Sequence, residues 1–395
     1  MTIDRSFTLD NWMDAPYNRP AFQHIREIVP TALIERGDGP VVDLPRDLLP
    51  LDGVTVQSRR GSTTTWADHL ADSFCDGVCV VHDGRIVDER YFNGMHERSL
   101  HLLMSVSKSF CAAAVGVAVG RGQLSIDDLV TDVAPEFVGT SLDGATVRHL
   151  VDMTAGTDFV EDYDAYSELA RPGEIPLLEY ERHAGYRPLE GRRPMGTLGH
   201  FRTYGTAFAH GARFQYRSPL TNITARLLEV ANDLPYHEIV SRDLWRPLGM
   251  EHDADIMLDP LRHPVVEGGM SCTLRDLARL GVAYLDDGVV DGREVIPCEW
   301  VTDTHAGDEA SLAAFAAQEG GAPDGWAMYR NAFWVMDRGV EYSGLGIFGQ
   351  YCWVHRPSRT VIARFSTYPE ALPDDLSAES MGAFQAVAEH LHAMH

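Results

Sequence analysis

The chain is organised around one stretch of sequence, His101-Leu102-Leu103-Met104-Ser105-Val106-Ser107-Lys108-Ser109-Phe110, and the apolar run Cys111 to Val119 that follows it. Lys108 is the only lysine: the other 32 of the 33 lysine and arginine residues are arginines. A guanidinium stays charged, whereas a buried ammonium loses its proton readily near neutral pH. The single lysine is therefore suited to proton transfer.

Ser105 precedes Lys108 by three residues. Residues at this spacing share one face of a helix, so the Ser105 hydroxyl and the Lys108 amine can meet. A hydroxyl beside a desolvated amine is an activated nucleophile, and the spacing is typical of Ser-x-x-Lys hydrolases. Lys108 could instead be an exposed residue of the first helical turn. A cation there opposes the helix dipole, however, and the apolar or small residues of 110–119 indicate burial all round.

Length and composition describe an ordinary globular protein. The chain has 395 residues, of which 45% are hydrophobic and 23% are charged, enough for one large or two medium cores. Its formal net charge of −25 argues against nucleic acid and against anionic membrane surfaces as partners, since both require basic patches.

The compartment is expected to be the cytoplasm. The first residues show no apolar secretory signal, and the longest apolar run is too short to span a bilayer. No Cys-x-x-Cys pair occurs, so free thiols are expected. The cysteines are Cys75, Cys79, Cys111, Cys272, Cys298 and Cys352.

The first half of the chain predicts a hairpin that leads into a buried helix. Two strand-like runs flank the turn Asp83-Gly84, and the helix after Ser105 is expected to end near Gly120-Arg121-Gly122. We also expect a short helix at Ala21 to Val29 and another at Thr146 to Met153. From Ala155 to about Arg202 no clear period is visible, so we expect an irregular, lid-like segment there.

The second half predicts helices first and strands later. Helices are expected at Ser218 to Leu234, at His237 to Trp245 and from a capping signal at Thr273 through Leu285. Strands are expected at Ala332 to Met336, Gln350 to His355 and Thr360 to Ser366, followed by a terminal helix at Ala378 to His392.

This order predicts an α/β fold of the α+β type. An antiparallel sheet would be built from both ends of the chain, flanked by helices, with a mostly helical insertion. We assign residues 1–155 and 265–395 to the sheet region and residues 156–264 to the insertion.

Two further segments could complete the chemistry. Tyr216 and Ser218 place a phenol and a hydroxyl at the start of a predicted helix, where they could return a proton to a leaving group. The Gly-rich strand Ser343 to Gln350 allows close approach of its backbone to a substrate. Gly344-x-Gly346-x-x-Gly349 also spells a dinucleotide fingerprint, but a strand rather than a helix follows it. The acidic residues Glu161, Asp162, Asp164 and Glu168 fit a solvated loop better than a metal site.

Together these motifs resemble the serine β-lactamase and penicillin-binding-protein superfamily, and within it the 6-aminohexanoate-dimer (nylon-oligomer) hydrolases and related carboxylesterases. Besides Ser105-x-x-Lys108, Tyr216-x-Ser218 and the Gly-rich strand, the matching segments are Leu9-Asp10-Asn11-Trp12 with Asn18-Arg19, Glu161-Asp162-Tyr163, Gly268 to Thr273 with Arg275 to Arg279, and Gly346 to Gln350.

The resemblance implies a β-lactamase/transpeptidase-like fold and a role for each matching residue. Ser105 would be the acylated nucleophile, Lys108 its base and Tyr216 the proton relay. The backbone N–H groups of Ser105 and Ile347 would form the oxyanion hole. The substrate-binding residues would be Tyr163, Tyr186, Glu267 and Ser218. Tyr163 stands at the position of a tyrosine that engages the amide leaving group, and Tyr186 stands in place of a loop tryptophan. Glu267 lies near a position that tunes substrate preference. No metal or organic cofactor is implied.

Departures from the family pattern favour esters over β-lactams. Ile347-Phe348-Gly349 stands where class C β-lactamases have Lys-Thr-Gly, and Ser218 replaces the asparagine common in the Tyr-x-Asn motif. Glu181 is the candidate for reading a substrate amine. We expect a small-molecule ester or amide substrate. A β-lactamase or D,D-peptidase, and a penicillin-binding sensor without turnover, remain alternatives, and a homodimer is left open.

Overall fold

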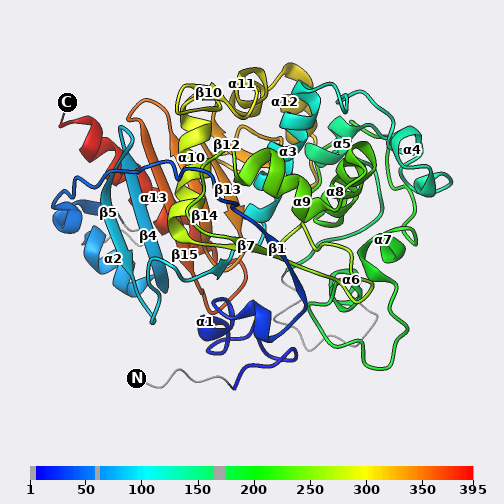
Figure 1. Cartoon of the computed structure of the whole chain (residues 1–395), viewed down its shortest axis with the longest axis horizontal. Helices are drawn as coiled ribbons and strands as arrows, with labels where there is room; N and C mark the ends of the chain where they lie inside the picture. The colour runs from blue at the N-terminus through cyan, green and yellow to red at the C-terminus, as the bar shows by residue number, and fades with distance from the viewer. Residues whose placement is uncertain (1–5, 58–62, 164–174, 395) are drawn as a thin grey trace.

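A seven-stranded antiparallel sheet forms the centre of one half of the molecule, in the order β11-β12-β13-β14-β15-β4-β5. The computed structural model describes residues 6–57, 63–163 and 175–394. Figure 1 shows β4 and β5, from the first quarter of the chain, beside β14 and β15 from its end. The strands are β4 (Cys75–His82), β5 (Arg85–Tyr91), β11 (Met328–Arg330), β12 (Phe333–Asp337), β13 (Glu341–Gly346), β14 (Gln350–His355) and β15 (Thr360–Ser366).

Both faces of this sheet are covered, because alternate residues of its strands point to opposite sides. On one face Val78, Val80 and Trp353 pack with α2 (Trp66–Asp72) and α13 (Asp374–His392). On the other face Cys79, Val81 and Cys352 belong to the main core with α3 (Val106–Gly120) and α10 (Leu274–Leu285). Burial on both faces explains why these strands read as nearly continuous apolar runs.

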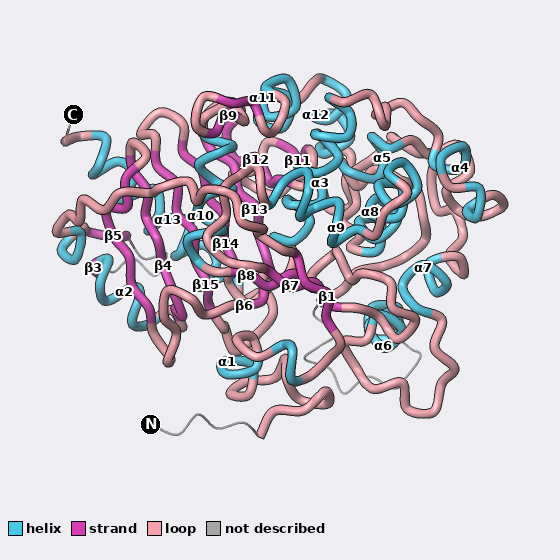
Figure 2. The backbone as a smooth tube through the Cα atoms, viewed as in Figure 1, coloured by secondary structure: helices cyan, strands magenta, loops and turns pink. Residues whose placement is uncertain are grey.

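A second, four-stranded sheet positions the start of α3. Its order is β1-β7-β8-β6, all antiparallel, and Figure 2 shows these short strands in the middle of the molecule. The strands are β1 (Thr31–Ile34), β6 (His101–Leu102), β7 (Ala254–Met257) and β8 (Met270–Cys272). Because β6 leads directly to Ser105, its pairing with β8 fixes where the nucleophile of the predicted site lies.

Helices make up most of the other half of the molecule (Figure 1). They are α4 (Val130–Val133), α5 (Val147–Val151), α6 (Pro176–Ala184), α7 (Gly196–Phe201), α8 (Pro219–Asn232) and α9 (Tyr236–Val240), which continues as a π-helical turn over Ser241–Trp245. α11 (Cys298–Ala306) and α12 (Glu309–Ala316) follow α10. The remaining elements are the short pairs β2 (Thr55–Gln57) with β3 (Thr63–Thr65) and β9 (Val289–Val290) with β10 (Arg293–Glu294), the helix α1 (Asn18–Ala21) and 3-10 turns at Ile25–Glu27, Leu51–Gly53 and Pro135–Phe137.

α3 is buried along nearly its whole length, from Val106 to Ala118. Its small residues are required by close packing: a Cβ added at Gly116 would lie 2.5 Å from the Trp300 ring. The helix therefore runs through the core between the large sheet and the helical half, and Ser105 and Lys108 stand at its N-terminal end.

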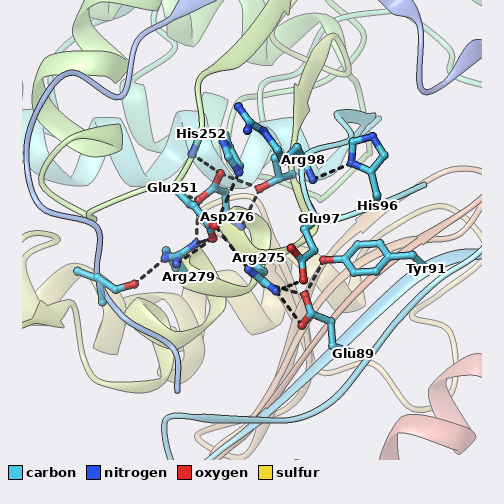
Figure 3. Close-up of polar contacts among 12 residues, drawn as sticks. Glu89, Tyr91, His96, Glu97, Arg98, Glu251, His252, Arg275, Asp276 and Arg279 are labelled. Atoms are coloured by element: carbon cyan, nitrogen blue, oxygen red, sulfur yellow. Dashed lines mark hydrogen bonds and ion pairs between the residues drawn. The ribbon is translucent and has the colours of Figure 1, made fainter. Parts of the chain in front are cut away.

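A network of ions ties the start of α10 to β5 and to the loop before β7 (Figure 3). Asp276 is buried and accepts hydrogen bonds from the Thr273 hydroxyl, from Arg279 and from two backbone N–H groups, those of Glu251 and His252. Next to it, Arg275 donates to three carboxylates, those of Glu89, Glu97 and Glu251. Arg46 also pairs with Glu89 and Glu97, so each carboxylate of this cluster contacts at least one arginine.

Most of the expected elements are confirmed. The turn at Asp83-Gly84 joins β4 to β5, and β14, β15 and α10 match their predicted ranges within one residue. Three expectations are wrong. The Gly-rich segment Ser343 to Gln350, expected to be one strand, consists of the end of β13, a turn over residues 347–349 and the first residue of β14. Ala21 to Val29 is the end of α1 followed by a 3-10 turn, and the segment from Ala155 to Arg202, expected to be irregular, contains α6 and α7.

The division into residues 1–155 with 265–395 and an insertion at 156–264 stays a prediction. β7 lies within the predicted insertion, yet it pairs with β1 and β8 outside it. Among the described residues, the structure contains no helix of the length and apolarity that crossing a membrane requires.

Candidate active site

Ser105 and Lys108 meet at the N-terminal end of α3. The Lys108 amine donates a hydrogen bond to the Ser105 hydroxyl oxygen over 2.7 Å and a second one to the backbone carbonyl of Glu267. Met104, directly before the serine, has φ of +45°, a backbone conformation that non-glycine residues rarely adopt. Ser105 is thus held at a sharp turn from β6 into α3, with its oxygen against the amine.

Burial changes the acid–base behaviour of Lys108. The side chain is 1% exposed, and this desolvation lowers the pKa of the ammonium to about 8. The carboxylates of Glu161 and Glu267 oppose this change by favouring the charged form. A substantial fraction of the amine is therefore neutral slightly above neutral pH, as a general base requires.

Tyr216 lies over the same amine, with its ring centroid 5.1 Å from Nζ of Lys108. Its ring also stacks on Trp334 at 5.5 Å and contacts Tyr329 edge-on at 5.8 Å. Burial, followed by the charge of Glu161, raises the pKa of the phenol, and the side chains of Ser105 and Ser218 are its hydrogen-bonding neighbours. Tyr216 is therefore a protonated phenol within hydrogen-bonding reach of the nucleophile.

Glu161 is a site residue whose role was not predicted from the sequence. Its carboxylate accepts hydrogen bonds from the backbone N–H of Ser218, from the Ser218 hydroxyl at 2.6 Å and from the Tyr163 hydroxyl. The nearest signal in the sequence was its place two residues before Tyr163. Of the other acidic residues of this loop, Asp162 is among the described residues, and Asp164 and Glu168 lie outside them.

A second group of unpredicted residues supports Glu267. One of its carboxyl oxygens accepts from the Tyr180 hydroxyl at 3.2 Å, and the Tyr180 oxygen in turn accepts from the Asn222 amide at 2.6 Å. The Asn222 carbonyl oxygen accepts from the backbone N–H groups of Val266 and Glu267. The segment that holds Lys108 through the Glu267 carbonyl is thereby tied to α6 and α8. Burial raises the pKa of the Glu267 carboxyl group, and the charge of Lys108 opposes this.

A cavity opens at Ser105 where α3, α6, α8 and the turn between β13 and β14 meet. Its lining residues are Met13, Met104, Ser105, Glu161, Tyr163, Leu177, Tyr180, Glu181, Tyr186, Ser218, Glu267, Gly268 and Ile347. The predicted substrate-binding residues Tyr163, Tyr186, Ser218 and Glu267 are thus brought together around the nucleophile. Glu181, the candidate for reading a substrate amine, is paired with Arg187 at 2.6 Å.

The predicted oxyanion hole combines the nucleophile with the end of β13. Ser105 and Ile347 line the same cavity, and Gly346 packs so tightly that an added Cβ would lie 2.5 Å from the Leu103 carbonyl oxygen. This close packing brings the backbone of β13 against the segment before Ser105. The pairing of the two N–H groups on one oxygen stays a prediction.

Tyr186 is fixed by the N-terminal segment of the chain. Its ring is stacked on Trp12 at a centroid distance of 5.9 Å, and its carbonyl accepts from the Trp12 indole at 2.7 Å. A Cβ added at Gly268 would lie 2.7 Å from the Tyr186 hydroxyl, so glycine makes room for it. The Leu9 to Trp12 segment singled out in the sequence therefore shapes the cavity through Tyr186. Within the described part of the chain, no group of three or more His, Cys, Asp or Glu residues could hold a metal ion.

Comparison with known proteins shows the family to which the chain belongs. The Beta-lactamase family model matches residues 66–381. The chain is 32% identical to 6-aminohexanoate-dimer hydrolase of Paenarthrobacter ureafaciens over 366 residues, which cover 92% of this chain and 88% of that protein. It is 28% identical to Esterase EstB of Burkholderia gladioli over 187 residues, 46% of this chain and 44% of the esterase.

Among solved structures, a Bacillus anthracis protein provisionally named 6-aminohexanoate-dimer hydrolase superposes with a TM-score of 0.87 at 23% identity. The superposition covers 100% of this chain and 99% of that one, and at this identity it speaks for the fold. The expected β-lactamase-like fold is thereby confirmed. The chain belongs to the Beta-lactamase family and is a serine hydrolase.

Proposed function

We propose that the protein hydrolyses carboxylic esters, and linear amides as a second class of substrate, through an acyl-enzyme on Ser105. The observation that carries the proposal is the 2.7 Å hydrogen bond between the buried Lys108 amine and the Ser105 hydroxyl, with the Tyr216 phenol beside both. This arrangement contains a nucleophile, a base with a lowered pKa and an acid with a raised one.

The proposed acylation starts with neutral Lys108. The amine takes the proton of the Ser105 hydroxyl while the oxygen attacks the substrate carbonyl carbon. The N–H groups of Ser105 and Ile347 stabilise the negative oxygen of the tetrahedral intermediate. Tyr216 then gives its proton to the leaving group and is reprotonated by Lys108, which leaves the acyl group on Ser105.

Deacylation repeats these transfers with water as the nucleophile. Tyr216 and Lys108 take a proton from the attacking water. The bond between the acyl carbon and the Ser105 oxygen then breaks, and the serine oxygen recovers its proton. The products are a carboxylic acid and the alcohol or amine released earlier. Every proton that moves therefore has a donor and an acceptor among Ser105, Lys108, Tyr216, the substrate and the attacking water.

The charge of the cavity supports an ester or amide substrate over a β-lactam. Glu161, Glu181 and Glu267 line it, and no arginine or lysine is found among the described residues of its wall. A penicillin carboxylate would meet these acidic groups without a cation to pair with. The name of the Paenarthrobacter ureafaciens relative makes a linear amide the second substrate to test.

We further propose that the enzyme works in the cytoplasm on a small-molecule substrate. All six cysteines are free, and five of them are buried, as expected for a protein of a reducing compartment.

The test is hydrolysis of p-nitrophenyl acetate and butyrate by the wild type and by Ser105→Ala, with nitrocefin and the 6-aminohexanoate dimer alongside. Ester turnover that disappears in the variant, with nitrocefin intact, is the expected result. Amide turnover that disappears in the same variant would add the second substrate class. Ester hydrolysis that survives in Ser105→Ala would overturn the proposal, and nitrocefin cleavage faster than ester cleavage would favour the β-lactamase alternative.

A further inference from the structure

Glu161 makes three hydrogen bonds that connect it with the catalytic group of residues. Its carboxylate receives the backbone N–H and the hydroxyl of Ser218 and the hydroxyl of Tyr163. It comes from the loop before residue 164, whereas Ser218 stands 57 residues later at the start of α8. The carboxylate is therefore held in one place, beside Tyr216 and in the wall of the cavity.

The bond from Ser218 to Glu161 determines what Ser218 can offer to Tyr216. A serine hydroxyl has one proton and two lone pairs. Since Ser218 gives its proton to Glu161 over 2.6 Å, it can meet the neighbouring Tyr216 hydroxyl only as an acceptor. As an acceptor, Ser218 can hold the Tyr216 hydroxyl in one orientation by its proton.

The charge of Glu161 acts in the same direction on both proton-transfer groups. It favours the protonated forms of Lys108 and of Tyr216. Other groups that interact with these residues act as well. Glu267 favours the protonated form of both Lys108 and Tyr216, and Tyr329 lies against the Tyr216 ring. Arg217 interacts with Glu161 and donates hydrogen bonds to the Phe159 and Ala155 carbonyls.

We propose that Glu161 is a positioning residue that sets the pH range in which Lys108 and Tyr216 exchange protons, and that it acts on Tyr216 through Ser218. The inference rests on the proposed function, because it assigns Lys108 as base and Tyr216 as acid. It goes beyond that function by adding a carboxylate whose hydrogen bonds go to Ser218 and Tyr163.

The direction of the effect on activity follows from the charges. Lys108 acts as a base only when neutral, so activity rises with pH on the acidic side of the profile. Because Glu161 favours the ammonium, its removal lowers the pKa of Lys108 and moves this rise to lower pH. Glu161→Gln keeps the size of the side chain and removes the charge, and it replaces one of the two acceptor oxygens by an NH2 donor.

The first experiment measures kcat/KM for p-nitrophenyl butyrate against pH in the wild type, Glu161→Gln and Glu161→Asp. Each rate is divided by the plateau rate of the same protein. At pH values below the wild-type midpoint, this relative rate should be at least about threefold higher in Glu161→Gln than in the wild type, which corresponds to a shift of half a pH unit. Glu161→Asp keeps the charge and should keep the midpoint. An unchanged midpoint in Glu161→Gln would overturn the inference.

Glu181→Gln is the matched control. Glu181 also lines the cavity, but it is paired with Arg187 and is not among the groups that shift the pKa of Lys108 or Tyr216. Its removal should leave the midpoint in place, whatever it does to the rate. If it moves the midpoint as far as Glu161→Gln does, the effect belongs to the cavity charge in general and not to Glu161.

A second readout separates this inference from the proposed function. The rate at which a fluorophosphonate labels Ser105 needs the serine and its base, but no ester substrate. Labelling whose midpoint shifts in Glu161→Gln, without ester turnover in the wild type, would uphold the inference and reject the esterase proposal. Ester turnover with an unshifted labelling midpoint would do the opposite.

Ser218→Ala tests the route to Tyr216 and removes only one oxygen, so it also serves if Glu161→Gln does not fold. p-Nitrophenolate leaves without a proton, whereas an alkoxide needs one from Tyr216. Ser218→Ala should therefore slow hydrolysis of ethyl butyrate at least about threefold more than hydrolysis of p-nitrophenyl butyrate. Equal effects on the two esters would reject the role of Ser218.

Discussion

The Lys108 amine lies 2.7 Å from the Ser105 hydroxyl oxygen, and its second hydrogen bond goes to a backbone carbonyl, that of Glu267. Neither acceptor is a carboxylate, so the amine is not locked into its charged form by an ion pair. Burial lowers its pKa, and the two nearby carboxylates moderate this effect from a distance. This relationship is what the proposed role of Lys108, as a base toward the Ser105 hydroxyl, requires.

Lys108→Arg should lower kcat/KM for p-nitrophenyl butyrate by about 10²–10⁴-fold, the usual contribution of a general base. The substitution keeps a positive charge, but a guanidinium does not lose its proton in the accessible pH range. The check is steady-state kinetics together with thermal unfolding, which shows whether the variant is folded. A folded variant with a rate within tenfold of the wild type would exclude Lys108 as the base.

The wild-type activity on p-nitrophenyl butyrate should rise with pH around pH 8, where buried Lys108 loses its proton. Glu267→Gln should move this rise to lower pH, because the Glu267 carboxylate favours the ammonium form of Lys108. The matched control is Asn222→Asp, which adds a charge behind Glu267 and should move the rise to higher pH. Shifts in the same direction for both variants would contradict this electrostatic explanation.

Tyr216→Phe should impair ethyl butyrate hydrolysis by about 10²–10⁴-fold and p-nitrophenyl butyrate hydrolysis less, because only the first leaving group needs a proton. Deacylation should also slow, so a burst of p-nitrophenol followed by a slower steady state is expected. Rapid-mixing absorbance measurements resolve these phases. An equal loss for both esters, without a burst, would remove Tyr216 from leaving-group protonation.

Much of the site could be predicted because its central signals are local. A single lysine three residues after a serine, ahead of an apolar run, predicts a reactive pair within one helical turn. The hairpin at Asp83-Gly84 and the alternating strands near the C-terminus are local in the same sense. From these local signals an antiparallel sheet built from both ends of the chain could be predicted. Its pairing of β4 with β15 joins residues almost 300 positions apart in sequence.

The supporting residues could not be predicted because their signals are not local. Glu161 and Ser218 are 57 residues apart, and Tyr180 and Glu267 are 87 apart. The second sheet could not be predicted because its strands have two to four residues, too few for a period to be visible. α6 was missed although Pro176 begins it and Gly185, with φ of +87°, ends it. These end signals were readable, but the polar residues between them concealed the helix.

Asp276→Ala should destabilise the fold by about 3–5 kcal/mol, because it leaves buried Arg279 and two backbone N–H groups without their carboxylate (Figure 3). The measurement is urea unfolding followed by circular dichroism. Asp286→Ala is a control at the other end of α10, where the pair with Arg359 is more exposed and should contribute at most about 1 kcal/mol. Equal losses for both variants would show that the buried network has no special weight.

Gly346→Ala should lower kcat by about 10²–10³-fold while the protein stays folded, the loss expected when an oxyanion-hole donor is displaced. The new Cβ would lie 2.5 Å from the Leu103 carbonyl oxygen and 3.1 Å from Cβ of Met104, so β13 must move away from the segment that carries Ser105. That movement would shift Ile347 away from the substrate oxygen that it is proposed to bind. Gly382→Ala in α13 is the control, because its Cβ would find only ordinary contact at 3.8 Å from the Gln57 carbonyl oxygen. Full activity in Gly346→Ala would mean that Ile347 does not form the oxyanion hole.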